Sequence, residues 1–212
     1  MKLSWASRIT ILRLLLIVPF VSCMLKINDA ALSESMCNAM RYVATFIFLV
    51  MAVSDALDGY LARRNKQVTR LGAFLDPIAD KLLIASACLL LASQRGRVEG
   101  FLLPPTVVVL IIGKDLFVLI GFVIIYFITS QFFIAPALIG KIANTLQLSM
   151  VAAILIAPEV SAFLPGWIWF LRVLWWSAGG AAVLATLVYI RKGTRYIGEY
   201  EQSLSKSASR ES

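Results

Sequence analysis

The stretch "LLPPTVVVLIIGKDLFVLIGFVIIYFI", residues 102–128, contains two charged side chains and is otherwise almost entirely apolar. A helix of about 20 such residues is long enough to cross the hydrocarbon core of a bilayer. The whole chain is 60% hydrophobic with a mean hydropathy of +0.84, well above a typical soluble protein. Similar runs occur at about 8–27, 40–62, 72–93, 141–157 and 166–190. We therefore predict an all-α integral membrane protein with six transmembrane helices.

Basic side chains are distributed unevenly among the segments that connect these spans. If the N-terminus is cytoplasmic, the inside segments hold 13 Lys and Arg residues and the outside segments hold four. The positive-inside rule therefore places both termini in the cytoplasm. Most of the net charge of +8 then reflects topology and attraction to anionic lipid head groups, so no nucleic-acid partner is expected.

One membrane domain, residues 1–192, accounts for most of the chain, and a polar cytoplasmic tail, residues 193–212, follows it. The tail, "GTRYIGEYEQSLSKSASRES", is rich in serine and charged residues. The chain has no histidine, and its three cysteines form no metal-ligand pattern. Any metal binding or proton transfer must therefore use other side chains.

Four aspartates lie close together in "SDALDGYLARRNKQVTRLGAFLDPIADKL", residues 54–82. Asp55 and Asp58 are three positions apart near the end of the second predicted span. Asp76 and Asp80 are four positions apart near the start of the third. These spacings place the members of each pair on one helical face. Since the link between the two helices is short, we expect the pairs to face each other at the cytoplasmic side.

Four converging carboxylates repel one another strongly unless they are protonated or hold divalent cations. An all-oxygen set suits Mg²⁺, Mn²⁺ or Ca²⁺ better than Zn²⁺, and four carboxylates can hold two ions side by side. The alternative is a group of surface carboxylates that pair with Arg63, Arg64 and Lys81. The clustering of four aspartates in an apolar chain favours a metal site.

The residues between the aspartates suit a bulky ligand that carries phosphate. Gly59 lowers helix stability by about 1 kcal/mol relative to alanine, which indicates that something approaches the backbone there. Ala62 is small on the same side, and Arg63 is placed to reach a phosphate. Gly72 opens the next helix, and Thr69 beside it can donate a hydroxyl. With the carboxylates, these residues indicate a diphosphate-bearing substrate.

Eight positions of this stretch resemble, without a departure, the signature of the CDP-alcohol phosphotransferase family: Asp55, Asp58, Gly59, Ala62, Arg63, Gly72, Asp76 and Asp80. Six helices, with the motif bridging the second and third, are also similar to this family. The resemblance implies an enzyme of phospholipid biosynthesis that cleaves the diphosphate of a CDP-linked alcohol, usually CDP-diacylglycerol. The phosphatidyl group would pass to an acceptor hydroxyl, and CMP would be released.

The resemblance also implies roles for individual residues. Two divalent ions, Mg²⁺ or Mn²⁺, would bridge the diphosphate, with Asp55, Asp58 and Asp76 as ligands. Asp80 would contact the second ion and serve as the catalytic general base on the acceptor hydroxyl. The CDP-alcohol pocket would be lined by Gly59, Ala62, Arg63, Thr69, Gly72 and Thr10. A homodimer in the bacterial inner membrane, with its active site facing the cytoplasm, is expected with these roles.

The acceptor should touch the later helices. Lys114 and Asp115 lie well inside the fourth span, where a charged pair indicates a functional site unless the two only neutralise each other. Lys141, at the start of the fifth span, is either a second acceptor ligand or a positive-inside anchor. We predict that these three residues bind the acceptor.

Within the family, these two stretches are similar to phosphatidylglycerophosphate synthases and to eukaryotic-type cardiolipin synthases, although the usual arginine of the fourth-span pair is lysine here. The acceptor is then glycerol 3-phosphate, which two lysines favour, or phosphatidylglycerol. The opening "WASRITILRLLL" resembles the family through Thr10 and Arg13, with Ser7 where asparagine is usual.

A divalent-cation transporter is the main alternative that is not an enzyme. A transporter needs acidic residues along a path through the membrane. The acidic residues of this chain cluster at one rim of the predicted bundle, and the outer halves of the spans carry almost none. The sequence therefore favours an enzyme.

Overall fold

The structure is a computed structural model that describes residues 5–65, 70–129 and 138–211. In these residues all regular secondary structure is helical, which confirms the predicted all-α class. The described residues form α1 (Trp5–Leu25), α2 (Glu34–Asn65), α3 (Arg70–Leu91), α4 (Pro105–Thr129), α5 (Leu138–Leu155), α6 (Ala157–Phe163) and α7 (Trp167–Glu211).

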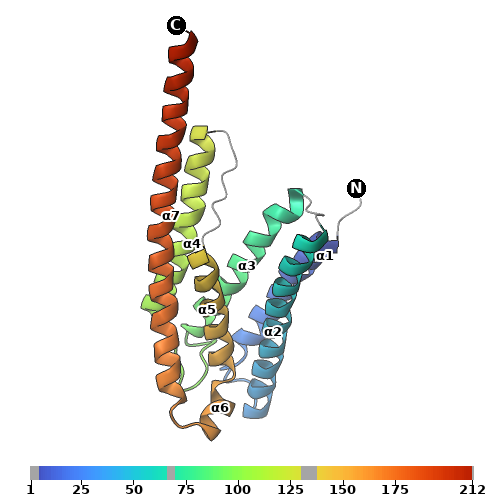
Figure 1. The fold of residues 1–212 in the computed structure, drawn as a ribbon. Coiled ribbons are helices and arrows are strands. Elements are labelled where there is room, and N and C mark those ends of the chain that lie inside the picture. Colours follow the sequence, from blue (N-terminus) through green and yellow to red (C-terminus); the bar gives the residue numbers. More distant parts are fainter. Residues whose placement is uncertain (1–4, 66–69, 130–137, 212) are drawn as a thin grey trace.

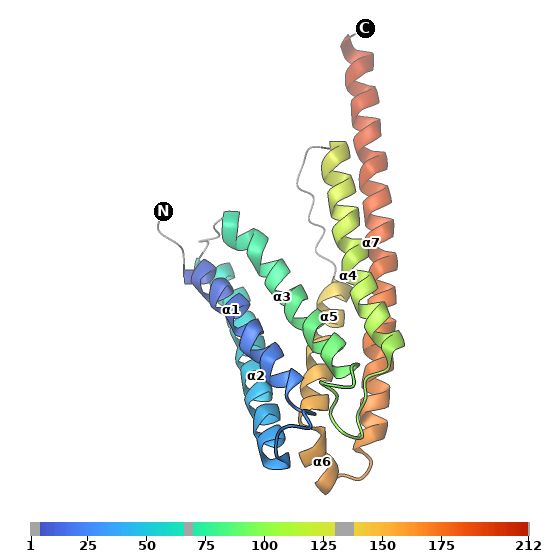
Figure 2. The same cartoon turned by 180° about the vertical axis from the view of Figure 1, so that it is seen from behind.

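The helices pack as two groups that meet along α3. In the first group, α1 packs along both α2 and α3, and the rings of Phe20 and Phe48 lie 5.9 Å apart between α1 and α2. In the second group, α7 packs along α4 and α5. Contacts of α3 with α4 and α5, and of α2 with α5, join the groups. Figures 1 and 2 show that α1 begins and α7 ends at the same end of the molecule.

Several helices are suited to a lipid environment. Within the residues that the structure describes, four helices contain stretches long and apolar enough to cross a membrane, and a shorter apolar helix covers Thr10–Leu25. The four stretches are Glu34–Ser54, Pro105–Ile125, Leu138–Leu155 and Trp167–Glu199. The membrane character of the prediction is thus confirmed, whereas six spans and the orientation of the termini stay predictions.

Large apolar side chains cover the outer surfaces of α4 and α7. Phe117 and Phe127 on α4 and Trp169 and Val173 on α7 are between 62% and 78% exposed. An apolar surface of this kind is unfavourable in water, and it is satisfied when lipid acyl chains cover it.

The end of the molecule near α6 is held together by polar contacts between distant segments. The Asn28 side-chain nitrogen donates to the carbonyls of Arg95 at 3.0 Å and Arg97 at 2.8 Å. These bonds tie the α1–α2 connection to the α3–α4 connection. Because an amide that donates twice is held in one orientation, the two connections are fixed relative to each other.

A second tie at this end joins α2 to the short helix α6, which the sequence analysis did not predict. Pro158 lies in the first turn of α6, where its missing N–H removes no helical hydrogen bond. Arg41 of α2 donates to both carboxylate oxygens of Glu159 in α6, and to the carbonyl of Leu155 at 2.9 Å. The hydrogen bonds from Arg41 lower the pKa of Glu159 to about 2.

Candidate functional site

The backbone places the four aspartates on two helices. Asp55 and Asp58 lie in the C-terminal turns of α2, and Asp76 and Asp80 lie in the first half of α3. The spacings of three and four are therefore helical spacings, which put the members of each pair on a common face. The side chains of Asp55, Asp58 and Asp76 lie outside the described part of the structure, so their convergence on a metal stays a prediction.

The predicted pocket for the CDP-alcohol is placed by its backbone in the same way. Gly59, Ala62 and Arg63 lie in α2 within two turns of Asp58, and Gly72 lies in the first turn of α3. The side chains of Ala62 and Arg63 lie outside the described part of the structure, and so does the whole of Thr69. Their substrate contacts stay predictions.

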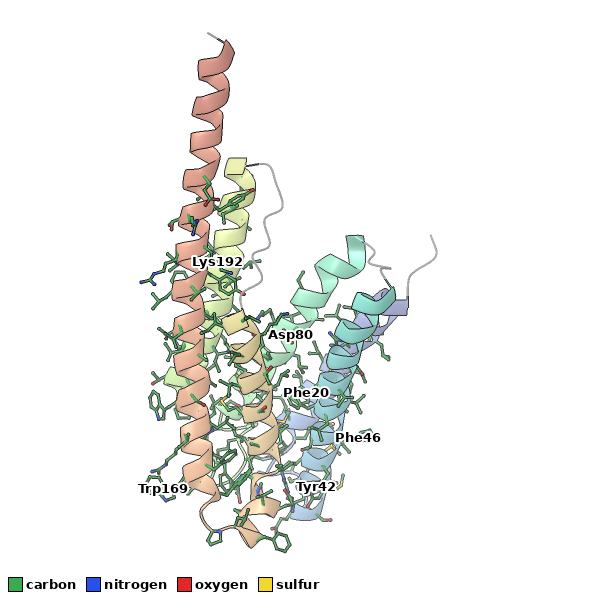
Figure 3. All side chains as sticks on the ribbon, viewed as in Figure 1. Phe20, Tyr42, Phe46, Asp80, Trp169 and Lys192 are labelled. Carbon is green, nitrogen blue, oxygen red and sulfur yellow. The ribbon has the colours of Figure 1, made fainter. Side chains whose placement is uncertain are left out.

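Of the four aspartates of the motif, Asp80 is the one whose side chain the structure describes, and this side chain is half-buried. Figure 3 shows it where α3 faces α5. Its Oδ2 atom accepts a hydrogen bond from the side-chain nitrogen of Asn144 on α5, with the two atoms 3.4 Å apart. The base predicted for the acceptor hydroxyl is therefore linked to the fifth helix.

Two lysine ammonium groups lie beside Asn144 and share the same two oxygen atoms. Lys81 and Lys114 bind one oxygen of Asp115 at 2.7 Å and 3.1 Å. They also donate to the side-chain oxygen of Asn144, at 3.2 Å for Lys81 and 3.0 Å for Lys114. The residues come from α3, α4 and α5, so the cluster lies where these helices meet. On the lysine side of Asn144, two cations and one carboxylate leave one positive charge in excess, which suits an anionic ligand, while the Asp80 carboxylate lies on the other side of the amide.

The Lys114–Asp115 pair was predicted as a charged pair, and the two side chains do form an ion pair. The structure adds a second cation, because Lys81 approaches Asp115 more closely than Lys114 does. Lys114 is only 4% exposed, and it also donates to the side-chain oxygen of Gln147 at 3.4 Å. A buried ammonium with several oxygen partners is a costly arrangement, which favours a functional use over an incidental one.

Gln147 completes the buried side of the cluster. Its side chain is fully buried on α5, and its Nε2 atom has no hydrogen-bond partner among the described residues. A buried amide donor without an acceptor is unfavourable, commonly by about 1–3 kcal/mol. This unpaired donor belongs to a side chain that also binds the Lys114 ammonium, and a ligand that supplies an oxygen atom would satisfy it.

Lys141 and Thr10 lie in different surroundings. Lys141 is exposed near the start of α5, and no contact in the described part of the chain joins its ammonium to the cluster. Thr10 is fully buried on α1, which packs along α2 and α3, the helices that carry the aspartates. Arg13, one turn further along α1, is 2% exposed. The roles predicted for Lys141 in acceptor binding and for Thr10 in substrate binding stay predictions.

Sequence reasoning missed Lys81 and Asn144 as members of the site. Lys81 directly follows Asp80 and was considered only as a neutralising partner for the aspartates. Asn144 is one of several polar residues of α5, together with Lys141, Thr145, Gln147 and Ser149, so its place in the sequence alone does not mark it. Gly140, one turn before Asn144, allows close packing, since the Tyr189 hydroxyl of α7 lies 2.5 Å from where a Cβ atom would be.

Comparisons with known proteins found a matching family model and several relatives. A family model described as CDP-alcohol phosphatidyltransferase matches residues 3–188. A relative from Bacillus subtilis is 31% identical over 153 residues, which cover 71% of this chain and 75% of the relative. A relative from Pseudomonas fluorescens is 42% identical over 110 residues, covering 52% of this chain and 50% of the relative. One from Haemophilus influenzae is 50% identical over 54 residues, 26% of this chain and 29% of the relative.

Each of these relatives is named CDP-diacylglycerol–glycerol-3-phosphate 3-phosphatidyltransferase. The chain spans half or less of the length of the Haemophilus and Pseudomonas relatives. Proteins described by the family model generally use divalent metals, CDP-diacylglycerol and an alcohol acceptor.

Proposed function

Because the chain belongs to the CDP-alcohol phosphatidyltransferase family, we propose that it transfers the phosphatidyl group of CDP-diacylglycerol to glycerol 3-phosphate and releases CMP. This reaction is a step of phospholipid biosynthesis. The observation that carries the choice of acceptor is the pair of ammonium groups, Lys81 and Lys114, placed next to Asp80 through Asn144. The relatives' shared name supports the same acceptor.

The donor set fits divalent metal ions. Asp55, Asp58, Asp76 and Asp80 offer only carboxylate oxygens, and the chain has no histidine, so the set suits Mg²⁺ or Mn²⁺. We assign these four residues to two ions, with Asp80 on the second. When bound, the ions would neutralise negative charge on the diphosphate and on the leaving CMP. Gly59, Ala62, Arg63, Thr69, Gly72 and Thr10 would line the pocket for the CDP-alcohol.

The remaining chemistry belongs to the acceptor side. The acceptor hydroxyl oxygen forms a bond to the phosphorus that carries the diacylglycerol, and the bond from that phosphorus to the CMP oxygen breaks. Asp80 takes the hydroxyl proton, as a general base within hydrogen-bond reach. Lys114 and Lys81, held by Asp115, bind the acceptor phosphate by charge-assisted hydrogen bonds. Lys141, exposed on the same helix as Asn144, attracts the acceptor from solvent.

The membrane arrangement follows from charge and hydropathy. We assign residues 1–192 to a six-span domain with both termini in the cytoplasm and residues 193–212 to a polar tail. The 13 basic residues in inside segments against four in outside segments support this orientation. The site then faces the cytoplasm from the inner membrane of a bacterium, since the relatives are bacterial. A homodimer is part of the same proposal.

Phosphatidylglycerol as acceptor, which would make the enzyme a cardiolipin synthase, is the closest alternative. Its phosphodiester carries less charge than the phosphomonoester of glycerol 3-phosphate, so the surplus positive charge of the cluster favours the latter. A divalent-cation transporter would need no site for an organic phosphate.

One experiment tests the reaction, the acceptor and the metal together. The purified protein in detergent receives CDP-diacylglycerol, Mg²⁺ and either glycerol 3-phosphate or phosphatidylglycerol, and CMP release is measured. We expect rapid release with glycerol 3-phosphate, none in excess chelator, and recovery when Mg²⁺ or Mn²⁺ is restored. Release with phosphatidylglycerol alone would overturn the acceptor, and full activity in chelator would overturn the metal site. No release with any alcohol would overturn the enzyme.

A further inference from the structure

We propose that Asn144 is a positioning residue that sets the geometry between the base Asp80 and the acceptor-phosphate site formed by Lys81 and Lys114. The inference rests on the proposed function, because the base and the phosphate site are parts of it. Asn144 carries no charge, but its side chain contacts the base and both cations.

The neighbours of Asn144 determine the orientation of its amide. The side-chain oxygen lies 3.0 Å from the Lys114 ammonium and 3.2 Å from that of Lys81, and both ammonium groups can only donate. The side-chain nitrogen lies 3.4 Å from the Asp80 carboxylate, which can only accept when ionised. A rotated amide would place its donors against two cations and its oxygen against an anion. The observed orientation is therefore strongly favoured.

The backbone around Asn144 is held in place by packing. Ala143, which precedes Asn144, and Gln147, about one turn later on α5, are fully buried. One turn earlier, Gly140 packs against the Tyr189 hydroxyl of α7. The Asn144 side chain is short and its helix is packed on both sides, so its amide nitrogen and oxygen can move little. The amide therefore acts as a spacer of fixed length between Asp80 and the two lysines.

This spacer has a consequence for the reaction. The acceptor must place its hydroxyl at Asp80 and its phosphate at Lys81 and Lys114 at the same time. Misplacement of a reacting group by about 1 Å can reduce the rate by about 100-fold. Asn144 should therefore affect turnover through Asp80 and acceptor affinity through the lysines, while CDP-diacylglycerol, held by other residues, is little affected.

Two variants test the two halves of the amide. Asn144→Ala removes both, and we expect kcat to fall about 10- to 100-fold and the acceptor KM to rise, as for other residues that orient a ligand of a catalytic metal. Asn144→Asp keeps the oxygen that faces the lysines but replaces the donor to Asp80 by a second oxygen. It should lose a similar factor in kcat, and because its added negative charge cancels the surplus positive charge of the lysines, its acceptor KM should also rise. In both variants the KM for CDP-diacylglycerol should change less than threefold.

The matched control is Asn38→Ala, the same chemical change at an exposed position in the first half of α2, which the proposed function does not use. It should leave all three constants unchanged. Thermal unfolding of each variant in detergent shows whether it folds. If Asn144→Ala fails to fold, the nearly isosteric Asn144→Asp decides the question.

The possible results distinguish this inference from the function on which it rests. If the wild type releases CMP with glycerol 3-phosphate and folded Asn144→Asp turns over at the wild-type rate, Asn144 does not position Asp80, although the proposed function stands. If the acceptor KM stays at the wild-type value in both variants, the oxygen does not hold the lysines and the spacer is wrong. If the wild type releases no CMP with any alcohol, the proposed function fails and this inference fails with it.

Discussion

A methyl group at Gly140 would meet the hydroxyl of Tyr189, and this contact yields a quantitative prediction. The Cβ atom of Gly140→Ala would lie 2.5 Å from the Tyr189 oxygen and 3.3 Å from the ring carbon that bears it. The first distance is about 1 Å shorter than the ~3.5 Å at which non-bonded atoms attract best. Since overpacking commonly destabilises by about 1–3 kcal/mol and alanine gains about 1 kcal/mol in helix propensity, we expect a net destabilisation of up to about 2 kcal/mol.

Removing the hydroxyl should remove most of this effect. In the Tyr189→Phe background, the new methyl group would meet two carbons of the aromatic ring at 3.3 and 3.4 Å, which leaves most of the gain in helix propensity unopposed. Gly140→Ala should then be neutral or stabilising by up to about 1 kcal/mol. The coupling energy of this double-mutant cycle should thus lie between about 1 and 3 kcal/mol.

Thermal unfolding in detergent, followed by tryptophan fluorescence, measures the four proteins of the cycle. For a chain of this size 1 kcal/mol corresponds to about 2–4 °C in Tm, so the single variant should lose up to about 8 °C. Gly121→Ala on α4 is the matched control, because nothing lies within 4 Å of its added Cβ atom and only helix propensity should change. If Gly140→Ala lowers the Tm equally in the wild-type and in the Tyr189→Phe background, the contact with the Tyr189 hydroxyl is not the cause of the loss.

Two further predictions concern charged groups. Lys81→Ala should raise the acceptor KM about 10- to 100-fold, because a charge-assisted hydrogen bond to the acceptor phosphate is lost. Lys141→Ala, at an exposed position, should raise the acceptor KM less. Both constants are measured by CMP release, and the reverse order would contradict the role of Lys81 in phosphate binding. Because the folded-state pKa of Glu159 is about 2, below its ordinary 4.5, the Arg41 ion pair stabilises fully above pH 4.5 and is lost towards pH 2. The Glu159 side chain is 38% exposed, so solvent weakens the pair, and the wild type should unfold only about 2–4 °C above the Glu159→Gln variant at pH 7. This difference in Tm should fall to zero as the pH is lowered from 4.5 to 2. A Tm difference that does not change with pH would show that the ion pair does not stabilise the protein.

Helix positions and the charged pair of the fourth span could be predicted because their signals are local. Apolar runs of about 20 residues locate α4 and α5 to within a few residues, and adjacent Lys114 and Asp115 are conspicuous in a span that has no other charge. The short helix α6 was missed because seven residues around Pro158 give no periodic pattern and extend the preceding apolar run. Helices of this length depend on neighbouring contacts, here those of Glu159 with Arg41.

The membership of the site could be predicted only in part, because it depends on how helices pack. Lys81 and Asp115 are 34 positions apart, and nothing in either local sequence shows that α3 and α4 bring them within 2.7 Å. Asn144 is uncharged, so it lacks the signal that identifies a charged residue inside a membrane. Its part in the site is visible only once α3, α4 and α5 are placed around it.

The length of α7 makes it a spacer between the bilayer and the solution beyond it. Its 45 residues extend roughly 68 Å at 1.5 Å per residue, whereas a bilayer with its head groups is about 40–45 Å thick. The candidate span of α7 ends at Glu199, and three more turns of helix follow. A fluorescent label or a fused reporter attached to these turns would be held about 15–20 Å beyond the end of that span by a continuous helix. Energy transfer from such a label to dyes in the head-group layer would then report how far α7 tilts.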